Sequence, residues 1–424
     1  METVKINNNI SLHYIEMKKL KTTVAGMYIR RRLCREDASK NALIPYVLKS
    51  GCMRYPKIQD INAQLDELYG AKMSTGVIKN GDNQVIFFDC ETISDKYAPN
   101  GEKLISGLLD MLFCVAFEPL CENDSFKNDI VEREKNTVKE KIQALIDDKR
   151  SYAQLRCTQE VCEGDAFAIS KFGEIEDLEK ISATELYEHY KKMITSSQID
   201  IFISGEANID ELSMQVKKYT DSMEFSECER TESAKIKPCD EVKKVTEKMD
   251  VTQGKLSIGF TTELTADDDR YPALVVANSI FGAGTHSKLF MNVREKLSLA
   301  YYASSMLNKH KGIMSINAGI EFKNFQKAYD EVILQLNELK NGNITDDELN
   351  FSITTITNTL KSHYDDQRYM QLYALDGLYL GIDTDLENYI DRIMKVTKED
   401  VIEVSKYIKE NTVYFLTGTN GGEE

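Results

Sequence analysis

The chain has 424 residues, a formal net charge of −16, 42% hydrophobic residues and 29% charged residues. This length predicts two domains of about 200 residues each, and the composition is that of an ordinary globular chain. Because phosphate groups attract Lys and Arg, so acidic a chain is a poor candidate for binding nucleic acid or an anionic membrane surface, whereas a basic peptide or a basic partner would suit it.

The first residues, METVKINNNISLHY, lack the basic and apolar regions of a signal peptide, and no run of about eighteen apolar residues occurs. We therefore expect no membrane span and a cytoplasmic location. Nine cysteines occur without a CxxC spacing. They are expected to be reduced thiols, mostly buried as small hydrophobic residues. The pairs with the shortest spacing are Cys114 with Cys121 and Cys157 with Cys162.

The first half begins with two predicted strands, in VKINNNISLHYIEM and TTVAGMYIRR. The segment KNALIPYVLKSG at 40–51 then has the composition of a buried helix, although a proline stands in its middle. A longer segment from Ser125, SFKNDIVEREKNTVKEKIQALIDD, predicts an amphipathic helix. The predicted apolar face comprises Val131, Val138, Ile142 and Leu145. The residues expected on a solvated face are Glu132, Glu134 and Glu140.

The second half begins with the strand KLSIGFTTEL and continues with an apolar helix, YPALVVANSI. The glycine-rich FGAGT at 281–285 lacks the lysine and the setting of a phosphate site, so we expect it to let the chain turn and approach another backbone closely. VREKLSLAYY then runs from a helix end into a strand and carries Arg294 and Tyr301. Arg can bind a carboxylate or a carbonyl, and Tyr can stabilise an oxyanion. By their spacing alone, the two would be a surface Arg and a half-buried Tyr.

The chain also repeats itself weakly. DDKRSYAQL from Asp147 corresponds to DDQRYMQLY from Asp365, and DLEKISATELYEHYKKMITSSQIDIFISG corresponds to DLENYIDRIMKVTKEDVIEVSKYIKENTVYFLTG. Both longer segments predict a capped helix, a turn and a closing strand. Ser182–Glu185 fits a capping box, and Thr397–Asp400 fits a looser acidic version of it. The chain is therefore expected to contain two homologous halves.

Strands and helices come in blocks in each half rather than in strict β-α-β alternation. This order favours an α+β fold, in which helices pack on a largely antiparallel sheet. The acidic region around 220–245 is poor in large apolar residues. We expect an N-terminal domain at 1–220, a linker at 221–245 and a C-terminal domain at 246–424. Two such domains would face each other across a cleft that receives a ligand.

Histidine is scarce, and its spacing does not predict a zinc site. The chain has His13, His189, His286, His310 and His363. No two of them stand four residues apart, and neither HxxEH nor HExxH occurs. A GxSxG elbow, a GxxxxGK[ST] loop and a GxGxxG motif are absent from the sequence as well. We therefore expect surface or hydrogen-bonded histidines, no bound metal and no other cofactor.

Together these segments resemble the inverted-zincin peptidases, the family of pitrilysin, insulysin and mitochondrial processing peptidase. The glycine-rich turn with VREKLSLAYY is similar to the family's second-half signature, and DIVEREKNTVKEKI to its Glu-bearing helix. LDELYGA at 65–71 is similar to the segment after the metal helix, so the resemblance covers essentially the whole chain. It implies duplicated α+β halves that form a closing chamber for peptides. It also implies that Arg294 and Tyr301 touch the peptide substrate.

The same resemblance implies a degenerate metal helix. In the family this helix carries HxxEH, then a few apolar residues and a glycine. With that glycine at Gly51, the first His falls on Ala42. The Glu then falls on Pro45 and the second His on Tyr46. Ala cannot bind a metal, Pro has no carboxylate to polarise water, and a neutral Tyr is a poor zinc ligand. Zinc, activated water and general base would thus be lost together.

The family's third metal ligand, a Glu, falls on Lys141, or on Glu140 if the alignment shifts by one residue. An ammonium group at Lys141 would repel a metal ion. Glu134 matches a supporting acidic position that this chain keeps.

Three functions follow from this pattern as hypotheses. The first is a non-catalytic, pseudo-peptidase subunit, inactive alone, which forms a heterodimer with an HxxEH-bearing homologue to enclose and process a peptide. An adjacent gene that encodes such a homologue would favour it. The second is a peptide-binding or scaffold protein without a peptidase partner, like core subunits of respiratory complexes. The third is an enzyme with an unorthodox site that uses His13 or the carboxylates of 132–148.

Overall fold

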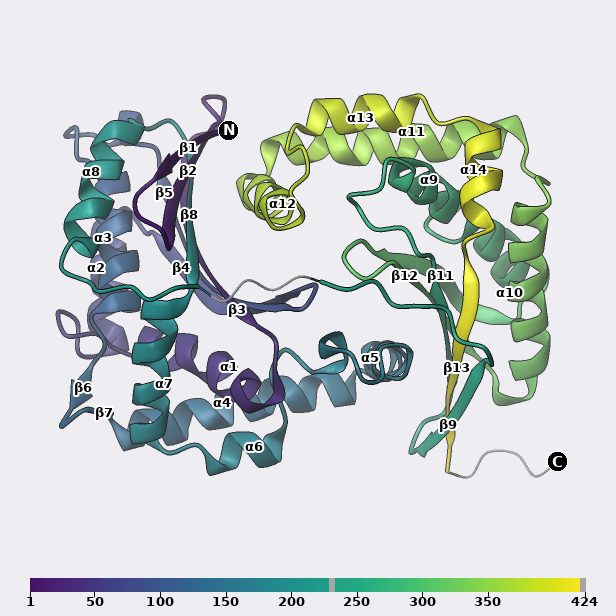
Figure 1. Cartoon of the computed structure of the whole chain (residues 1–424), viewed down its shortest axis with the longest axis horizontal. Coiled ribbons are helices and arrows are strands. Elements are labelled where there is room, and N and C mark those ends of the chain that lie inside the picture. The colour runs from purple at the N-terminus through teal and green to yellow at the C-terminus, as the bar shows by residue number, and fades with distance from the viewer. Residues whose placement is uncertain (229–232, 420–424) are drawn as a thin grey trace. The chain divides into compact units, whose positions relative to one another are not determined.

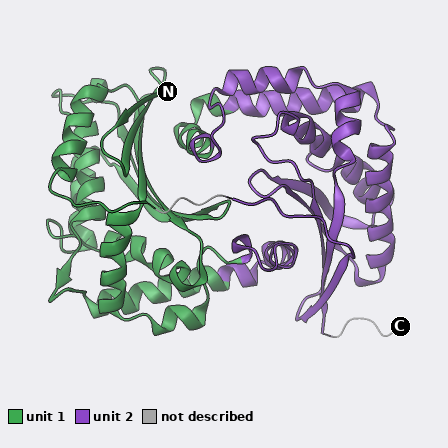
Figure 2. Cartoon of the chain, in the orientation of Figure 1, with its two compact units in different colours: residues 1–143, 169–232, 363–376 green, residues 144–168, 233–362, 377–424 purple. Residues whose placement is uncertain are grey.

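The computed structural model describes residues 1–228 and 233–419, which form two compact units (Figure 1, Figure 2). Unit 1 comprises 1–143, 169–232 and 363–376, and unit 2 comprises 144–168, 233–362 and 377–424. Each unit therefore includes one short segment from the other half of the sequence. The predicted linker at 221–245 contains residues 229–232, which lie outside the described residues, and the domain boundaries at 220 and 246 stay a prediction.

Unit 1 is built on a six-stranded sheet with the order β1-β2-β8-β3-β5-β4. The strands are β1 (Glu2–Lys5), β2 (Ile10–Glu16), β3 (Thr22–Arg32), β4 (Lys72–Asn80), β5 (Asn83–Ile93) and β8 (Gln198–Gly205). All neighbouring strands pair antiparallel except β2 and β8, which are parallel. The short loop between β4 and β5 makes a hairpin, with Asn80 opposite Asn83. A largely antiparallel sheet was predicted, and the structure confirms it.

Helices cover both faces of this sheet. Apart from α5 (Lys149–Val161), which belongs to unit 2, the helices of the first half are α1 (Arg35–Lys49), α2 (Ile58–Glu67), α3 (Leu104–Phe117), α4 (Asn128–Asp147), α6 (Ile175–Lys180), α7 (Ala183–Ser196) and α8 (Ile209–Thr220). Helix α3 contacts β3 and β5, and α1 contacts β4 and β5. The opposite face carries α12 (Gln367–Leu380), whose residues up to Asp376 belong to unit 1 (Figure 1).

Unit 2 has a five-stranded sheet with the order β11-β12-β10-β13-β9. Its strands are β9 (Lys243–Met249), β10 (Gly254–Thr261), β11 (Ala300–Asn308), β12 (Ile313–Ile320) and β13 (Lys409–Gly418). Only β9 and β13 pair in parallel. One face carries α9 (Tyr271–Phe281), which contacts α10 (Phe325–Lys340), α11 (Asp346–Ser362), α13 (Leu386–Met394) and α14 (Lys398–Ser405). Helix α5 (Lys149–Val161) covers the other face of the same sheet (Figure 1).

The predicted repeat corresponds to equivalent elements. DDKRSYAQL begins α5, and DDQRYMQLY leads into α12, so the two repeated segments form the helices that lie on the second face of each sheet. At Ser182 one half of the predicted capping box is present, since the Ser182 hydroxyl accepts a hydrogen bond from the Glu185 N–H. Thr397 and Asp400 form a full, reciprocal capping box. The longer repeated segments form α6, α7 and β8 in one unit and α13, α14 and β13 in the other.

The helices on the second face of each sheet, α5 and α12, make different kinds of contact with the strands. On α5, Ala153, Cys157 and Val161 join an apolar cluster with Tyr414 and Leu416.

Within the described residues, no helix is both long and apolar enough to cross a membrane.

On α12, the contacts with the sheet are mostly polar. The fully buried Gln371 donates hydrogen bonds to the Val24 carbonyl and the Ser204 hydroxyl, and it accepts one from the Tyr28 hydroxyl. Gln367 donates to the carbonyls of Thr22 and Ser204. Because buried amides must find partners, these hydrogen bonds of Gln367 and Gln371, the polar layer of α12, determine how the helix lies on the sheet.

Candidate functional site

Helix α1 carries three of the four positions that the resemblance assigns to the lost metal site. It continues through Pro45, although Pro lacks the N–H that would bond to the carbonyl of the residue one turn earlier. Tertiary burial offsets this loss, because Ala42, Leu43 and Ile44 are fully buried against the rest of unit 1. Ala42 thus contributes only a methyl group to the core, and Pro45 is buried beside it.

Tyr46 and Lys141 come together in the structure. The Lys141 ammonium lies 5.2 Å from the centre of the half-buried Tyr46 ring, which is a cation–π contact between α4 and α1. The Tyr46 hydroxyl also lies close to Gly76 of β4, where an added Cβ would be 3.4 Å from it. Burial, together with the nearby charge of Glu134, raises the pKa of Tyr46. The phenol therefore stays protonated at neutral pH and does not offer an anionic oxygen to a metal.

Of the two alternatives for the third ligand, Lys141 faces α1 and Glu140 is exposed. The ammonium group of Lys171 is close enough to Lys141 to be affected by its charge. Burial and the positive charge of Lys141 lower the pKa of Lys171. Lys141 and Lys171 thus present cations where a metal site needs anionic or neutral donors.

Glu134 lies inside the protein rather than on the solvated face that was expected. Its carboxylate accepts a hydrogen bond from the Ser50 hydroxyl at 2.9 Å and pairs with the Arg133 guanidinium at 2.8 Å. Only about 9% of Glu134 is exposed. The expectation was wrong for Glu134 because the hydroxyl at the end of α1 offers a donor that spacing along α4 does not reveal. Glu132 and Glu140 are exposed as expected.

The residues at these positions do not fit a zinc ion. Ala42 and Pro45 have no donor atoms, Tyr46 is a neutral phenol, and Lys141 is a cation. Across residues 1–228 and 233–419, no three His, Cys, Asp or Glu side chains gather in a way that could hold a metal ion. The histidines have structural partners instead: His13 contacts Thr3 and Asp200, His189 contacts Asn41, and His286 contacts Ser352.

Arg294 and Tyr301 lie in unit 2, on both sides of one tight connection. Arg294 belongs to a π-helical segment, Leu289–Lys296, and its guanidinium lies 4.6 Å from the Phe290 ring centre. Its side chain is 43% exposed. The chain then turns through Ser298, whose φ of 51° is left-handed, and enters the edge strand β11.

Tyr301 is an extra residue at the start of β11. Ala300 pairs with Ile320 and Tyr302 with Gly319, so Tyr301 forms a β-bulge and points outward. It is 67% exposed, and no described residue bonds to its hydroxyl. Spacing predicted a half-buried Tyr301, and this was wrong because the bulge turns Tyr301 outward. The half-buried residue is the next one, Tyr302, which lies over Gly319 and under the guanidinium of Arg150 at 4.2 Å.

The glycine-rich turn behaves as predicted. The Gly282 carbonyl accepts a hydrogen bond from the Ser305 N–H of β11, and a Cβ at Gly282 would lie 2.5 Å from the Ser305 hydroxyl. Glycine is needed here because the turn after α9 touches the strand directly. The turn thus positions the segment that carries Arg294 and Tyr301.

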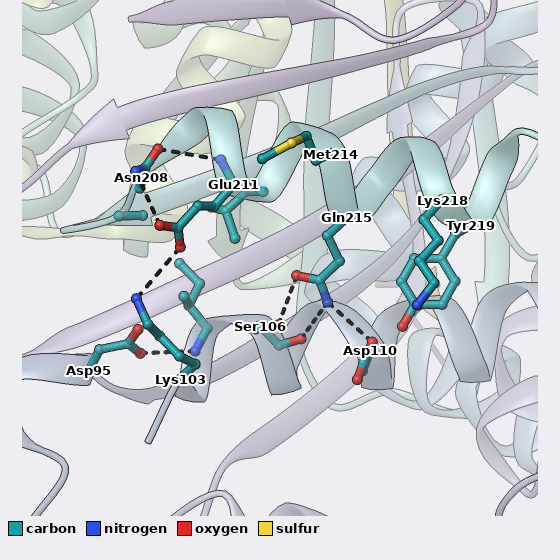
Figure 3. Close-up of a pocket in the computed structure, with 13 residues that line it drawn as sticks. Asp95, Lys103, Ser106, Asp110, Asn208, Glu211, Met214, Gln215, Lys218 and Tyr219 are labelled. Carbon is teal, nitrogen blue, oxygen red and sulfur yellow. Dashed lines mark hydrogen bonds and ion pairs between the residues drawn. The ribbon is translucent and has the colours of Figure 1, made fainter. Parts of the chain in front are cut away.

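A surface hollow of about 540 Å³ between α3 and α8 was not predicted from the sequence (Figure 3). Figure 3 shows that polar groups of the two helices face one another across it. Gln215 bonds to Ser106 and Asp110, and Lys103 lies 3.5 Å from Glu211. These side chains partner one another, so they provide no set of groups that converge on a substrate.

Comparison with known proteins decides the family. Residues 180–356 match the family described as "Peptidase M16 inactive domain". A Bacillus subtilis protein described as "Probable inactive metalloprotease YmfF" is 35% identical over 98% of this chain and 97% of its own length. The chain belongs to the M16 peptidase family.

Solved structures agree with the M16 fold. A conserved protein from Enterococcus faecalis has a TM-score of 0.92 and 28% identity, covering 100% of this chain and 99% of that one. An M16 inactive-domain protein from Pseudomonas fluorescens has a TM-score of 0.81 at 16% identity, with the same coverage, and supports the fold alone. The chain is thus a metalloprotease-like M16 protein of two α+β units, in which HxxEH is absent.

Proposed function

We propose that this chain is the non-catalytic subunit of an M16 zinc peptidase. It forms a heterodimer with an HxxEH-bearing homologue, and the two chains together enclose and process a peptide. The observation that carries this proposal is an asymmetry. The metal-helix positions Ala42, Pro45 and Tyr46 are buried or half-buried, whereas Tyr301 and Arg294 are exposed, with the Arg294 guanidinium 3.6 Å from the Glu295 carboxylate.

In this arrangement the partner supplies zinc, the activated water and the general base, and this chain supplies binding groups. The Arg294 guanidinium presents several N–H donors in a fixed plane, suited to a peptide carbonyl or carboxylate. The Tyr301 hydroxyl donates one further hydrogen bond to a carbonyl oxygen. Placing a bulky, exposed Tyr on a bulge gains nothing for folding, so a role in binding accounts for it better than one in stability.

Charge favours one class of peptide. The chain carries a net charge of −16, which attracts a basic peptide and steers its association. None of the nine cysteines, all of which lie among the described residues, forms a disulfide, as suits the reducing cytoplasm in which we place the heterodimer.

The decisive experiment is reconstitution. The chain and the HxxEH-bearing M16 homologue from the same genome are purified separately and mixed, and cleavage of a pool of basic peptides is followed with and without a zinc chelator. We expect neither chain alone to cleave efficiently, and the mixture to cleave in a chelator-sensitive way while eluting as one complex. A homologue that is fully active alone and never elutes with this chain would instead support the scaffold function.

A further inference from the structure

Two cysteines far apart in the sequence lie in direct contact in unit 1. Cys52 follows α1, Cys114 lies in α3, and their sulfur atoms are 2.7 Å apart. Both side chains are fully buried. Sequence spacing does not reveal this pair, because it cannot show that the chain after α1 meets α3.

Backbone hydrogen bonds hold Cys52 in this position. Its N–H donates to the Tyr55 carbonyl at 2.9 Å, and the Tyr55 N–H donates back to the Cys52 carbonyl at 3.1 Å. The next residue, Met53, donates to the Glu118 carbonyl just after α3. The turn 52–55 is therefore fixed against the end of α3, and the two sulfurs are held together.

The surroundings make the two thiols unequal. The hydrogen bond from the Cys114 thiol lowers the pKa of Cys52, and the N–H groups of Tyr55 and Arg54 lower it further, against the opposing effect of burial. The same contact raises the pKa of Cys114. Cys52 is thus the sulfur that ionises, and Cys114 keeps its proton. Nucleophilic attack requires the thiolate, so the pair has a distinct attacking and a distinct resolving sulfur.

The buried Cys90 shows the contrast within the same unit. Burial strongly raises the pKa of the Cys90 thiol, as in an inert core cysteine. Cys52 is buried as well, but the two residues that follow it, Met53 and Arg54, are 68% and 39% exposed. The buried Cys52 thus stands beside two solvent-exposed residues along the chain.

We propose that Cys52 and Cys114 form a site of reversible oxidation by hydrogen peroxide. The Cys52 thiolate attacks one peroxide oxygen, the O–O bond breaks, and hydroxide leaves, which forms a sulfenic acid on Cys52. The Cys114 sulfur then attacks the Cys52 sulfur. The S–S bond forms, the S–O bond breaks, and the hydroxyl group leaves as water with the remaining proton. In total, two thiols and one peroxide give one disulfide and two waters, and a dithiol reductant reverses the change.

The disulfide would join the residue after α1 to α3, which lies on the sheet. Closing so long a loop restricts the unfolded chain, so oxidation should raise the Tm of the protein by about 5 °C or more. A transient disulfide of this kind is compatible with a reducing compartment, where such bonds are mostly redox-sensing.

The test uses the full, reduced chain. It is treated with hydrogen peroxide, unfolded in an alkylating reagent and mapped by mass spectrometry without reduction. We expect a Cys52–Cys114 linkage in most molecules, free thiols at Cys90 and Cys157, and loss of the linkage after treatment with dithiothreitol. Oxidation of the exposed Cys239 in the same sample shows that the peroxide was active. If Cys239 is oxidised while Cys52 and Cys114 both remain free, the proposal is wrong, and this result needs no variant.

A Cys114→Ser variant separates the two steps. Without the resolving thiol, Cys52 should stop at the sulfenic acid and react with dimedone, and the peroxide-dependent rise in Tm should disappear. A matched Cys157→Ser variant, in unit 2, should keep both the linkage and the rise. Dimedone labelling at Cys114 rather than at Cys52 in single-cysteine variants of the pair would overturn the assignment of the attacking sulfur.

Discussion

The Lys141 ammonium lies 5.2 Å from the centre of the Tyr46 ring, so a cation–π contact joins α4 to α1 at two positions to which the family resemblance assigns zinc ligands. Such a contact contributes about 0.5–2 kcal/mol. A bound zinc ion would contribute far more to holding two helices together. In this chain, packing around Ala42 and the Ser50–Glu134 hydrogen bond also connect the same elements.

The first prediction concerns zinc. Protein purified alone, without added metal and without a metal-binding affinity tag, should contain less than about a tenth of an equivalent of zinc per chain, because none of the four side chains that the resemblance assigns to the metal site is a zinc donor at neutral pH. Elemental analysis after dialysis measures this directly. A full equivalent that survives dialysis would mean that other residues form a metal site.

The second prediction rebuilds the site and also decides its alignment. Ala42→His, Pro45→Glu and Tyr46→His restore HxxEH on α1, and Lys141→Glu supplies the third carboxylate. We expect the quadruple variant to bind about one zinc per chain, and the triple variant that keeps Lys141 to bind much less. If the triple variant already binds zinc fully, Glu140 is the third ligand and the alignment shifts by one residue. Overpacking at the buried Ala42 should cost about 1–3 kcal/mol of stability in both variants.

The third prediction separates binding from folding. Arg294→Ala and Tyr301→Phe should each lower the peptidase activity of the reconstituted heterodimer by about tenfold or more, as expected when a positioned hydrogen-bond donor is removed. Both side chains are exposed, so the free energy of unfolding should change by less than about 0.5 kcal/mol. Met306→Ala, at another exposed position on β11, serves as the control and should retain activity. Unchanged activity in both variants would assign Arg294 and Tyr301 to structure alone.

The internal repeat and the order of elements could be predicted from sequence, because capping residues and helical periodicity are local signals. The placement of α5 and α12 could not. An apolar or polar stripe shows that a helix has a partner, but not which sheet receives it. Residues 149–161 follow α4 in the sequence, yet they pack on the sheet of unit 2.

The environment of single residues in the site could not be predicted from sequence either. Arg294 and Tyr301 were singled out by the family resemblance, but the bulge that exposes Tyr301 and leaves Tyr302 half-buried depends on pairing with β12. The burial of Glu134 and the contact of Cys52 with Cys114 could not be predicted for a related reason. The partners Ser50 and Cys114 are brought to these residues only by the tertiary fold.

The fourth prediction tests the polar layer under α12. Gln371→Leu removes the fully buried amide that bonds to the Val24 carbonyl, the Ser204 hydroxyl and the Tyr28 hydroxyl, of which the Tyr28 hydroxyl keeps its bond to Asp89. We expect a loss of about 2–4 kcal/mol in the free energy of unfolding, measured by urea denaturation, since unsatisfied buried groups are costly. Leu372→Gln, at an exposed position on the same helix, should change it by less than about 0.5 kcal/mol. Equal effects of the two substitutions would mean that the polar layer does not stabilise the packing of α12 on the sheet.

The fifth prediction concerns pH and Asp89, which faces α12 from β5. Burial raises the pKa of Asp89 to about 6, although the Arg368 guanidinium and the Tyr28 hydroxyl act in the opposite direction. Since the pKa in the folded state lies above the unfolded value, the folded state holds a proton that the unfolded state has already lost. Stability from this group is therefore complete below about pH 4 and falls as the pH rises through about 6.

The expected loss is about 3 kcal/mol, because each unit of pKa difference corresponds to about 1.4 kcal/mol. An Asp89→Asn side chain does not ionise. Relative to the wild type, this variant should therefore become more stable by up to about 3 kcal/mol as the pH rises from about 4 to about 7. Urea denaturation of both proteins at several pH values measures the difference. A difference that stays constant over this range would show that Asp89 ionises in the folded protein as readily as in the unfolded chain, and that the contact with Arg368 offsets its burial.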